Sequence, residues 1–315
     1  MSVAIGLVGA RGYVGREMIA LIAAHPEFDL AFAGSRELAG TRVSKLAPEY
    51  KGALTFSQTA PEDVGRAGAD AVVLGLPNGK SAPFIAALEE LSPATVVLDL
   101  SGDHRDAEGW AYGLPELERD GLRGARRIAN PGCYATAAQL ALAPVADLVR
   151  GPATVFGVSG WSGAGTRPSR KTDPDALKDN IQPYGLQGHA HEAEIARGVG
   201  LDIRFHPSVA PFFRGLTVVA SADLARDAEG AARARFRAAY AEEPFVMVQD
   251  DAAEPAAVAG THLCRIGAIA SDARRRFVAT AALDNLLKGA ASQAIQNLNL
   301  AFELPETTGL DPAAS

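Results

Sequence analysis

Cys133 stands at a position that favours chemistry. It follows Asn130-Pro131-Gly132, where a short apolar run ends and a helical pattern begins. The unpaired N–H groups at the start of a helix stabilise a thiolate, which is the nucleophilic form of cysteine. The preceding proline and glycine favour a tight approach that exposes the sulfur at the carboxyl end of a sheet, where cofactors bind. We therefore predict a nucleophile at Cys133, whereas Cys264 lies inside an apolar run and is interpreted as a small buried hydrophobic residue.

A second cluster of reactive groups occupies residues 187–194, where a helix is predicted to begin. His189 and His191 can each carry a proton near neutral pH, so either can act as a general acid or base beside a nucleophile. The spacing His189-x-His191-x-x-Glu194 also fits three ligands of a metal ion. The residues alone therefore leave two functions open, which are a thiol enzyme with a histidine proton carrier and a metal-dependent hydrolase.

A glycine-rich turn lies between a predicted strand and a predicted helix near the start of the sequence. Gly9, Gly12 and Gly15 form the pattern Gly-x-x-Gly-x-x-Gly, one residue off the dinucleotide-binding Gly-x-Gly-x-x-Gly. Small residues allow backbone N–H groups to approach a pyrophosphate, and the helix N-terminus adds the positive end of its dipole. A glycine-rich turn without a ligand is the alternative interpretation.

The residues after the second predicted strand indicate which dinucleotide binds. NAD sites usually place an acidic residue there for the ribose hydroxyls. Here the strand ends in Gly34-Ser35-Arg36, and a hydroxyl with a planar guanidinium suits the 2′-phosphate of NADP. Arg36 can otherwise be an ordinary surface charge. A thiolate beside a nicotinamide favours acyl transfer to sulfur followed by hydride transfer.

Residues 1–150 alternate short β-branched runs with helical patterns, which is typical of a parallel α/β sheet of the Rossmann type. The expected strands are 3–8, 28–34, 71–76, 95–100 and one ending at 128–129, and the expected helices are 12–24, 81–91 and 133–143. The continuous apolar runs at 71–76 and 95–100 predict strands that are buried on both faces.

The pattern changes after about Gly151. The expected strands are 154–159, 203–209, 216–222, 245–248, 263–270 and 277–283, and the expected helices are 191–199 and 227–240. This predicts an α+β domain over residues 151–283, with a mixed sheet and helices on one face. A last helix at about 285–302 is expected to return to the first domain, so that residues 284–315 complete it, with 305–315 as a tail-like segment.

Length and composition exclude several classes of protein. The chain has 315 residues, which suggests two domains, and 48% of them are hydrophobic, which excludes a disordered protein. The balance of 30 basic and 37 acidic residues, without long blocks of either sign, argues against a nucleic-acid or membrane partner. Two cysteines and the absence of a secretory pattern predict a reducing, cytoplasmic location. The uncharged stretch 128–146 contains Asn130, Pro131 and Gln139, so it is interpreted as a buried loop and helix.

Taken together, these segments resemble the N-acetyl-γ-glutamyl-phosphate reductase family, the arginine-pathway members of the aspartate-semialdehyde dehydrogenase-like group. The resemblance is collinear over almost the whole chain. The matching segments are 9–15, Ser35-Arg36, 76–79, 99–105, 112–116, 130–134, 159–165, 184–194, 213–215 and 284–290. The cysteine segment and the double-histidine segment are the most specific.

The resemblance implies an NADP-dependent enzyme that carries out a two-step reduction. Cys133 would attack the γ-carbonyl of N-acetyl-γ-glutamyl phosphate and expel phosphate, and hydride from NADPH would reduce the thioacyl group to N-acetyl-glutamate 5-semialdehyde. His189 would be the general acid/base. A homodimer or homotetramer, assembled through the sheet of the second domain, and a small-molecule substrate are the implied partners.

The same resemblance implies further site residues. The expected substrate contacts are Arg105, Asn130, His191 and Arg214. A surface ion pair is the alternative for each arginine. The expected cofactor contacts are Gly9, Gly12, Tyr13, Val14, Gly15, Ser35, Arg36, Pro77, Ser162 and Gly163. No metal is expected.

The chain departs from the family pattern at three places. Where the family usually has Asp-Phe-Arg, it has Asp103-His104-Arg105, which places a histidine close to the expected substrate contacts. The family usually has His-Arg-His-x-Pro-Glu, and at residues 189–194 this chain has neither the arginine nor the proline. Ala135 stands where the family has a proline after the cysteine-tyrosine pair. The alternatives are a sibling reductase of aspartyl phosphate or an aminoadipyl derivative, the metal-dependent hydrolase, and a non-catalytic NADP-binding sensor.

Overall fold

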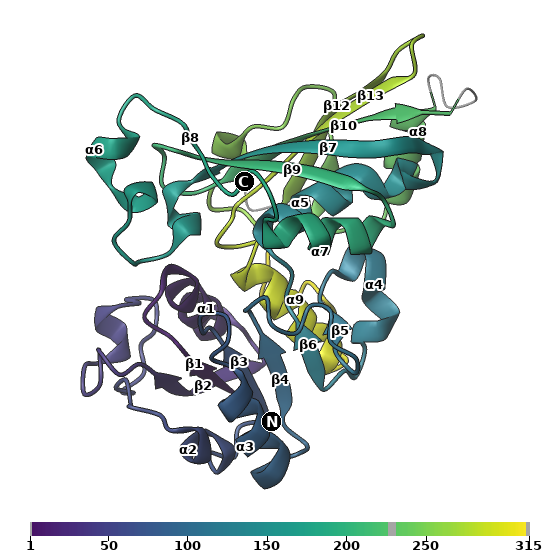
Figure 1. The fold of residues 1–315 in the computed structure, drawn as a ribbon. Coiled ribbons are helices and arrows are strands. Elements are labelled where there is room, and N and C mark those ends of the chain that lie inside the picture. Colours follow the sequence, from purple (N-terminus) through teal and green to yellow (C-terminus); the bar gives the residue numbers. More distant parts are fainter. Residues whose placement is uncertain (1, 226–230, 313–315) are drawn as a thin grey trace. The chain divides into compact units, whose positions relative to one another are not determined.

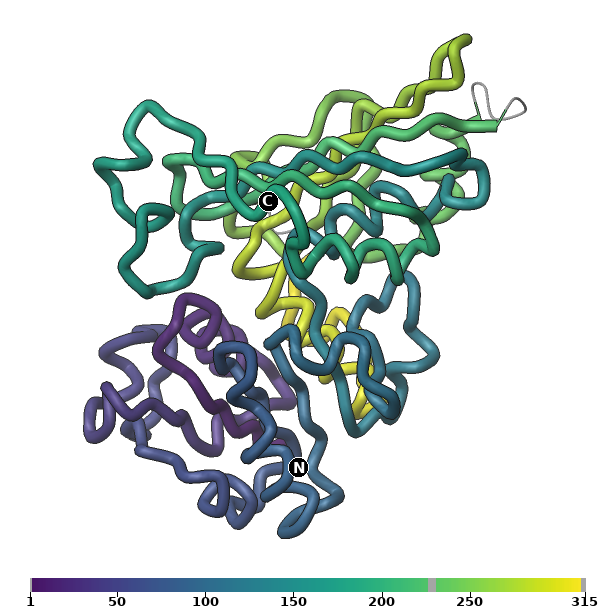
Figure 2. The backbone as a smooth tube through the Cα atoms, viewed as in Figure 1, coloured from purple at the N-terminus to yellow at the C-terminus, as the bar shows by residue number. Residues whose placement is uncertain are grey.

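The computed structural model describes residues 2–225 and 231–312, which form two compact units (Figures 1 and 2). The first unit contains the chain up to Pro131 together with Ala290–Asp311, and the second spans Gly132–Gly289. The change in sequence pattern placed the boundaries at 150/151 and 283/284. The contacts change from one unit to the other earlier, because helix α5 (Cys133–Leu142) packs on strands of the second unit.

The first unit is built on a parallel sheet with the strand order β2-β1-β3-β4-β6-β5. Its strands are β1 (Val3–Val8), β2 (Phe28–Gly34), β3 (Ala71–Leu74), β4 (Val96–Asp99), β5 (Ala111–Tyr112) and β6 (Arg127–Ala129). Every residue of β3 and β4 is buried, as predicted for strands covered on both faces. Because the strands are parallel, the loops that follow β1, β2, β3 and β4 meet at the carboxyl edge of the sheet.

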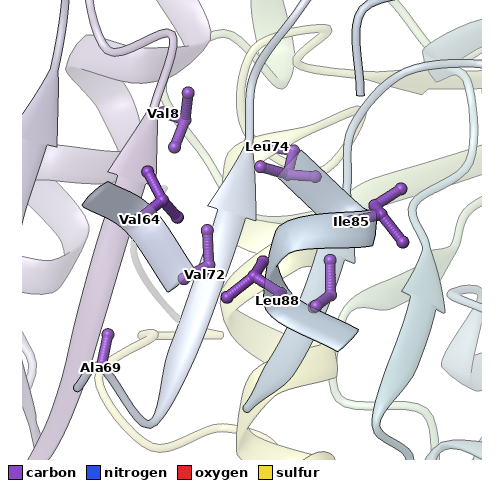
Figure 3. Close-up of a cluster of buried hydrophobic side chains, with 8 residues drawn as sticks. Val8, Val64, Ala69, Val72, Leu74, Ile85 and Leu88 are labelled. Atoms are coloured by element: carbon purple, nitrogen blue, oxygen red, sulfur yellow. The ribbon is translucent and has the colours of Figure 1, made fainter. Parts of the chain in front are cut away.

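Apolar side chains hold the helices of the first unit to this sheet. The helices are α1 (Tyr13–Ala24), α2 (Pro61–Gly65), α3 (Ala82–Leu91), α4 (Pro115–Leu122) and α9 (Ala291–Ala301). Figure 3 shows one cluster, in which side chains of α2 and α3 pack onto β3. Its members are Val8, Val64, Ala69, Val72, Leu74, Ile85, Leu88 and Val97. Full burial of each larger member contributes about 1.5–3 kcal/mol, so the cluster fixes the strands that precede two of the edge loops.

The last helix belongs to the first unit, where it packs on α1 and α4. It is shorter than predicted, since α9 begins only at Ala291. The segment before it forms turns, in which the buried carboxylate of Asp284 accepts the N–H group of Leu286 at 2.8 Å. That carboxylate competes with the helical hydrogen-bond pattern, although the apolar spacing of the segment is helical.

The residues after α9 are packed rather than tail-like as far as the structure describes them. The side-chain amide of Asn299 donates to the backbone carbonyls of Glu306 and Thr308 at 3.1 and 2.8 Å. The ring of His25, at the C-cap of α1, also contacts Asn299, through Nε2 at 3.0 Å from Oδ1. The segment is thus anchored to α9 through Asn299, and His25 also forms a hydrogen bond with the backbone of Thr308.

The second unit is built on a mixed sheet with the order β11-β12-β13-β10-β7-β9-β8. Its strands are β7 (Val149–Gly160), β8 (Gln182–Pro183), β9 (Ile203–Ala210), β10 (Leu216–Leu224), β11 (Val246–Val248), β12 (Cys264–Ser271) and β13 (Arg276–Leu283). Buried residues alternate with less buried ones along β10, so one face of the sheet is covered and the other is accessible. Figure 1 shows α5 and α7 (Ala190–Val199) against the same side of the sheet, and α8 (Ala232–Ala239) contacts β12.

Most expected elements of the second unit are present with shifted ends. β7 starts at Val149, earlier than predicted, and the expected helix 227–240 appears as α8, while residues 227–230 lie outside the described residues. The elements that sequence patterns missed are short, such as α6 (Pro174–Leu177) and β8. Short 3-10 turns lie at Val43–Lys45, Ala143–Leu148, Trp161–Ala164, Arg170–Thr172 and Pro255–Ala257. Within residues 2–225 and 231–312, no helix has the length and hydropathy needed to cross a bilayer.

Candidate active site

Cys133 is the first residue of α5. Gly132 is the N-cap in an extended conformation, no side chain caps this end, and the first helical bond runs from the N–H of Thr136 to the carbonyl of Gly132 at 2.8 Å. The N–H groups before Thr136 thus lack partners within the helix, and such groups stabilise a thiolate. Cys133 is partly exposed, whereas Cys264 is fully buried, as predicted. Cys133 is therefore a partly exposed residue at an end of a helix that favours the thiolate form.

Glu194 of α7 holds the start of α5 in place. Its Oε1 accepts the N–H group of Gly132 at 2.9 Å, and its side chain is buried. The helices α5 and α7 pack against each other, so this bond joins the residue before the nucleophile to a neighbouring helix. The sequence analysis considered Glu194 only as a metal ligand and missed this role.

Gly289 leaves room for the nucleophile. A Cβ atom at position 289 would lie 2.6 Å from the Cβ of Cys133 and 2.9 Å from the Cα of Asn285. Side chains do not approach that closely without displacing their neighbours, so a larger residue would push against α5. Sequence reasoning placed Gly289 inside a resembling segment but gave it no role.

Strand β9 supports an aromatic cluster beside the nucleophile, which consists of Tyr134, Tyr184, His189, His191 and Phe205. Phe205 of β9 is at its centre, with ring centroids 5.2 Å from Tyr134, 5.2 Å from His189 and 6.2 Å from His191. Backbone carbonyls of β9 fix the two tyrosines. The hydroxyl of Tyr134 donates to Ser208 at 2.8 Å, and the N–H of Tyr184 donates to Pro207 at 3.1 Å.

His189 caps α7, which determines where its proton lies. The ring Nδ1 accepts the backbone N–H of His191 at 3.2 Å. A neutral imidazole with an accepting Nδ1 carries its hydrogen on Nε2. Burial lowers the pKa of His189 and the positive charge of Lys171 lowers it further, while Glu192 and Glu194 act in the opposite direction. His189 is therefore a neutral ring that presents Nε2–H as a hydrogen-bond donor.

Both tyrosines of the aromatic cluster have raised pKa values, to which burial and the neighbouring Cys133 contribute. Burial, the neighbouring Tyr184 and the Cys133 charge raise the pKa of Tyr134. Burial and then the Cys133 charge raise the pKa of Tyr184. Both phenols therefore stay protonated near neutral pH, so they are uncharged neighbours of Cys133. Sequence analysis included the two tyrosines in resembling segments without a function.

Two of the three candidate metal ligands bind backbone N–H groups. Glu194 binds the N–H of Gly132, and Nδ1 of His189 binds the N–H of His191. In the part of the chain that the structure describes, no three or more His, Cys, Asp or Glu side chains are grouped to hold a metal ion. The arrangement gives no support to the metal-dependent hydrolase.

Arg214 and Ser162 belong to a hydrogen-bonded loop region of the second unit. The Nε of Arg214 donates to the buried Asp284 at 2.5 Å, and the N–H of Gly260 donates to the same oxygen at 2.6 Å. Asn285 donates to Ser162 Oγ at 2.9 Å, and its Oδ1 accepts the N–H of Gly215 at 2.7 Å. These bonds fix the turn Trp161–Ala164, which includes Gly163, after β7.

The glycine-rich turn of the first unit has the shape of a dinucleotide cradle. Gly9 has φ of +83° and approaches Gly75 so closely that a Cβ would lie 2.2 Å from its carbonyl oxygen. At Gly15 a Cβ would meet the carbonyl oxygen of Ala10 at 2.4 Å, whereas the space beside Gly12 is open. No side chain caps α1, so the first-turn N–H groups, including those at Tyr13 and Val14, are placed for an anionic ligand.

Ser35 and Arg36, the two residues expected to bind the 2′-phosphate, follow β2. Ser35 is buried, and its Oγ accepts the N–H of Leu38 at 3.3 Å, while Arg36 is exposed. Arg11, in the glycine-rich turn, forms an ion pair with Glu37. That pair joins the turn to the residue after Arg36, a contact that sequence reasoning did not anticipate.

Arg105 and Asn130 meet at the carboxyl edge of the first sheet. The Nε of Arg105 donates to the carbonyl of Asn130 at 2.9 Å, and its NH2 group donates to the carbonyl of Leu100 at 3.3 Å. The side chain of Asn130 is buried and bonded to Ala290 and Asn297 at 3.4 and 3.1 Å. Asn130 therefore positions Arg105 through its backbone.

His104 is bound to a buried carboxylate. Its Nδ1 lies 2.6 Å from Oδ2 of Asp99, a carboxylate that also accepts hydrogen bonds from Ser81 and Ser101 and is fully buried. The ring stacks on Trp110, with centroids 4.2 Å apart, and its side chain is 19% exposed. Pro77, an expected cofactor contact, lies in the loop after β3. The histidine that departs from the family pattern is thus fixed at the edge of the sheet.

Two family models together match most of the chain. Residues 4–125 match the NAD binding domain of semialdehyde dehydrogenases, and residues 133–285 match their dimerisation domain. The chain belongs to the semialdehyde dehydrogenase family. The gap between the matches includes the boundary at 131/132 where the two units divide. Members of this family are NAD(P)-dependent oxidoreductases, so the predicted family, enzyme class and nucleotide-binding domain are confirmed.

Curated relatives and solved structures agree with that assignment. The N-acetyl-gamma-glutamyl-phosphate reductase of Stenotrophomonas maltophilia (strain R551-3) is 49% identical over 97% of both chains, and that of Xanthomonas axonopodis pv. citri (strain 306) is 48% identical over 95% of both. Aspartate semialdehyde dehydrogenase II of Vibrio cholerae, complexed with ASA, superimposes with a TM-score of 0.77 at 17% identity, over 96% of this chain and 99% of that one. The Candida albicans enzyme with NADP gives 0.73 at 17% identity, over 96% and 99%. The solved structures show the shared fold and confirm the predicted architecture.

Proposed function

We propose that this chain reduces N-acetyl-γ-glutamyl phosphate to N-acetyl-glutamate 5-semialdehyde and phosphate, with NADPH as the reductant. The observation that carries the proposal is Cys133, a partly exposed thiol at the first residue of α5, beside an aromatic cluster that holds the neutral ring of His189. The relatives that bear the name of this reductase are similar to the chain over nearly its full length.

The first unit fits the dinucleotide. The close approaches at Gly9 and Gly15 would be blocked by any side chain, and the uncapped start of α1 is suited to a pyrophosphate. Ser35 and Arg36 follow β2, where their hydroxyl and guanidinium suit a 2′-phosphate, and Pro77 follows β3 in a further loop of the same unit. When bound, NADPH supplies the hydride for the reduction.

The chemical steps proceed on Sγ of Cys133. The thiolate attacks the γ-carbonyl carbon, the bond between that carbon and the phosphoryl oxygen breaks, and phosphate leaves with the electron pair. After reduction of the thioacyl carbon, the former carbonyl oxygen carries a negative charge. Its electron pair then re-forms the carbonyl, the carbon–sulfur bond breaks, and the thiolate is regenerated with release of the aldehyde.

His189 stabilises the oxygen through Nε2–H. Because Nδ1 is occupied by the N–H of His191, the ring offers a donor rather than a vacant Nε2. A donor suits the reductive direction, since the charged oxygen needs a hydrogen bond and the thiolate leaves without a proton. In the reverse direction the thiolate adds to the aldehyde carbon, and the same Nε2–H stabilises the alkoxide that forms before hydride leaves.

The remaining substrate contacts divide into two kinds. We propose that Arg105 and His191 contact the substrate, since either anionic group of the substrate needs a charged or hydrogen-bonding partner. Asn130 positions Arg105 through its carbonyl at 2.9 Å. Arg214 positions the loop region through its bond to Asp284 at 2.5 Å.

The accessible face of the second sheet supports a homo-oligomer. Phe156 and Val219 are paired neighbours on β7 and β10, with 45% and 37% of their surfaces exposed, and the half-buried His206 of β9 continues the row beside Phe156. Exposed apolar side chains in the middle of a sheet favour burial against a second copy. We propose a homodimer through this face, or a homotetramer that contains it. Light scattering on the purified chain should give twice or four times the subunit mass, and a monomer would contradict the proposal.

The cysteine thiols also support a cytoplasmic location. Neither Cys133 nor Cys264 forms a disulfide, and cysteines that stay reduced are typical of the cytosol. Detection of Cys133 as a thiol in protein isolated under acid trapping would support this, whereas a blocked or oxidised thiol would oppose it.

The decisive test is the reaction in the oxidative direction. The purified chain should reduce NADP only when N-acetyl-glutamate 5-semialdehyde and phosphate are both present. Aspartate semialdehyde and an aminoadipate semialdehyde serve as controls for the sibling reductases, and prior chelation should leave the activity unchanged. Faster turnover of either control aldehyde would contradict the assigned substrate.

A further inference from the structure

Lys171 occupies a short closed turn of the second unit. The turn Arg170–Thr172 begins after Ser169. The hydroxyl of Thr172 accepts the N–H of Ser169 at 2.9 Å and donates to the carbonyl of Arg167 at 3.1 Å. These bonds bridge both ends of the turn, so the backbone that carries Lys171 is held locally.

The ammonium group of Lys171 lies on the aromatic cluster. Its Nζ is 4.1 Å from the centroid of the Tyr184 ring, a cation–π distance. Tyr184 in turn lies edge-on to His189, with ring centroids 5.6 Å apart, and its backbone N–H is bonded to β9. The ring of Tyr184 therefore contacts both the ammonium group of Lys171 and the ring of His189.

This charge lacks an internal counterion. Among residues 2–225 and 231–312, no carboxylate lies within ion-pair distance of Nζ of Lys171. The carboxylates of α7 that act on His189 are both bound to backbone donors, Glu192 to the N–H of Phe205 at 3.0 Å and Glu194 to that of Gly132 at 2.9 Å. A cation held on the aromatic cluster, with the carboxylates of α7 bound to backbone donors, is suited to an anionic ligand.

We propose that Lys171 is a substrate-binding residue whose ammonium group pairs with an oxyanion of the substrate. The inference rests on the proposed function, and the oxyanion is either the α-carboxylate or the phosphoryl group of the acyl phosphate. Tyr184 holds the ammonium at this place through its ring face, so that the cation is preorganised before the substrate arrives. The sequence analysis named no residue of this turn.

The oxidative direction separates the two oxyanions, because the semialdehyde carries the carboxylate and phosphate is a separate substrate. We would measure kcat and both KM values for the wild-type chain, Lys171→Met and Lys171→Arg. Lys178→Met is the matched control, since it removes the same charge from an exposed position in the same segment. Alkylation of Cys133 by iodoacetamide and the unfolding temperature report on the integrity of the site and the fold.

We expect Lys171→Met to raise one KM by about ten- to hundredfold, the range for loss of a charge-assisted hydrogen bond. A higher KM for the semialdehyde assigns the carboxylate, and a higher KM for phosphate assigns the phosphoryl group. Lys171→Arg should restore most of the loss, and Lys178→Met should resemble the wild type. Alkylation and unfolding should be unchanged throughout.

Two results would overturn the inference. In one, both KM values of Lys171→Met equal those of Lys178→Met. In the other, kcat alone falls, which would show that Lys171 acts only through His189 or the fold. Absence of turnover by the wild-type chain itself would instead contradict the proposed function, and the inference with it.

Discussion

Glu194 accepts the backbone N–H of Gly132 at 2.9 Å, one residue before Cys133. The bond has two consequences. It holds the N-cap of α5 against α7, and it places a buried carboxylate near Cys133, the proposed nucleophile. The positive end of the α5 helix dipole has the opposite effect, because it stabilises a thiolate at Cys133. The position of the nucleophile thus depends on a carboxylate whose charge opposes the reactive form.

Replacement of Cys133 by serine should reduce the rate by about 10³-fold or more, because an unactivated hydroxyl is a much weaker nucleophile than a thiolate at neutral pH. Single-turnover and steady-state rates with the natural substrate would measure the loss. The variant Cys264→Ser, at the buried second cysteine, is the control for removal of a thiol. More than a tenth of wild-type turnover in Cys133→Ser would contradict the assignment.

Replacement of Glu194 by alanine should lower the free energy of unfolding by about 1–3 kcal/mol, because the N–H of Gly132 would lose its partner in a buried place. It should also lower kcat, since α5 begins at that point. Glu194→Gln retains an accepting oxygen and should keep most of the stability. Urea unfolding of both variants would measure the difference, and equal stability of all three chains would show that the bond contributes nothing.

Replacement of Gly289 by alanine should disturb the nucleophile directly, because the new Cβ would lie 2.6 Å from the Cβ of Cys133. Overpacking of this kind costs about 1–3 kcal/mol, and turnover should fall as α5 shifts. A Cβ added at Gly121 in α4 would meet no atom within 4 Å, so Gly121→Ala is the control. That control should be neutral or more stable by roughly 0.5–1 kcal/mol. Wild-type turnover and stability in Gly289→Ala would refute the steric argument.

Replacement of Arg36 by aspartate should weaken NADPH binding far more than NADH binding, through loss of the partner of the 2′-phosphate. Titration of each dinucleotide by its fluorescence would give the two affinities. Arg66→Asp, with the same change of charge after α2, controls for long-range electrostatics. An unchanged ratio of the two affinities would show that Arg36 does not contact the phosphate.

Acidification should destabilise the first unit through His25. Burial lowers the pKa of His25 below its usual 6.5, against the opposing effects of Asn299, Thr308 and Glu27. As the pH falls through about 6.5, His25 of the unfolded chain binds a proton, whereas His25 of the folded chain stays neutral to a lower pH. The free energy of unfolding is therefore highest above that pH and decreases below it. Nδ1 of His25 accepts the N–H of Glu27 at 3.1 Å, and protonation would remove that bond.

The measurement is urea unfolding at about pH 8 and about pH 5.5 for the wild-type chain and His25→Phe. His189, whose pKa is also lowered, contributes the same trend in both chains. The variant should therefore retain a smaller fall in stability than the wild type. An identical fall in the two chains would show that His25 does not titrate between these pH values.

Much of the fold follows from local pattern. The continuous apolar runs of β3 and β4 and the alternation along β10 report directly which faces are buried, so the parallel and the mixed sheet could both be predicted. The first residue of the last helix could not be predicted in this way. Its apolar spacing extends back to residue 285, but the buried carboxylate of Asp284 binds the N–H of Leu286 and delays the helix to Ala291.

The sequence by itself determined the family and the candidate residues, because a cysteine after Pro131-Gly132 and a glycine-rich turn after a strand are recognised from their neighbours in the chain. Tertiary structure decided how the groups are held. Glu194 binds Gly132, which lies 62 positions earlier in the sequence. Gly289, the last residue of the second unit before the chain returns to the first, lies next to Cys133 near its start. Hydrogen bonds and close packing of this kind depend on distance in space, which residue spacing along the chain does not record.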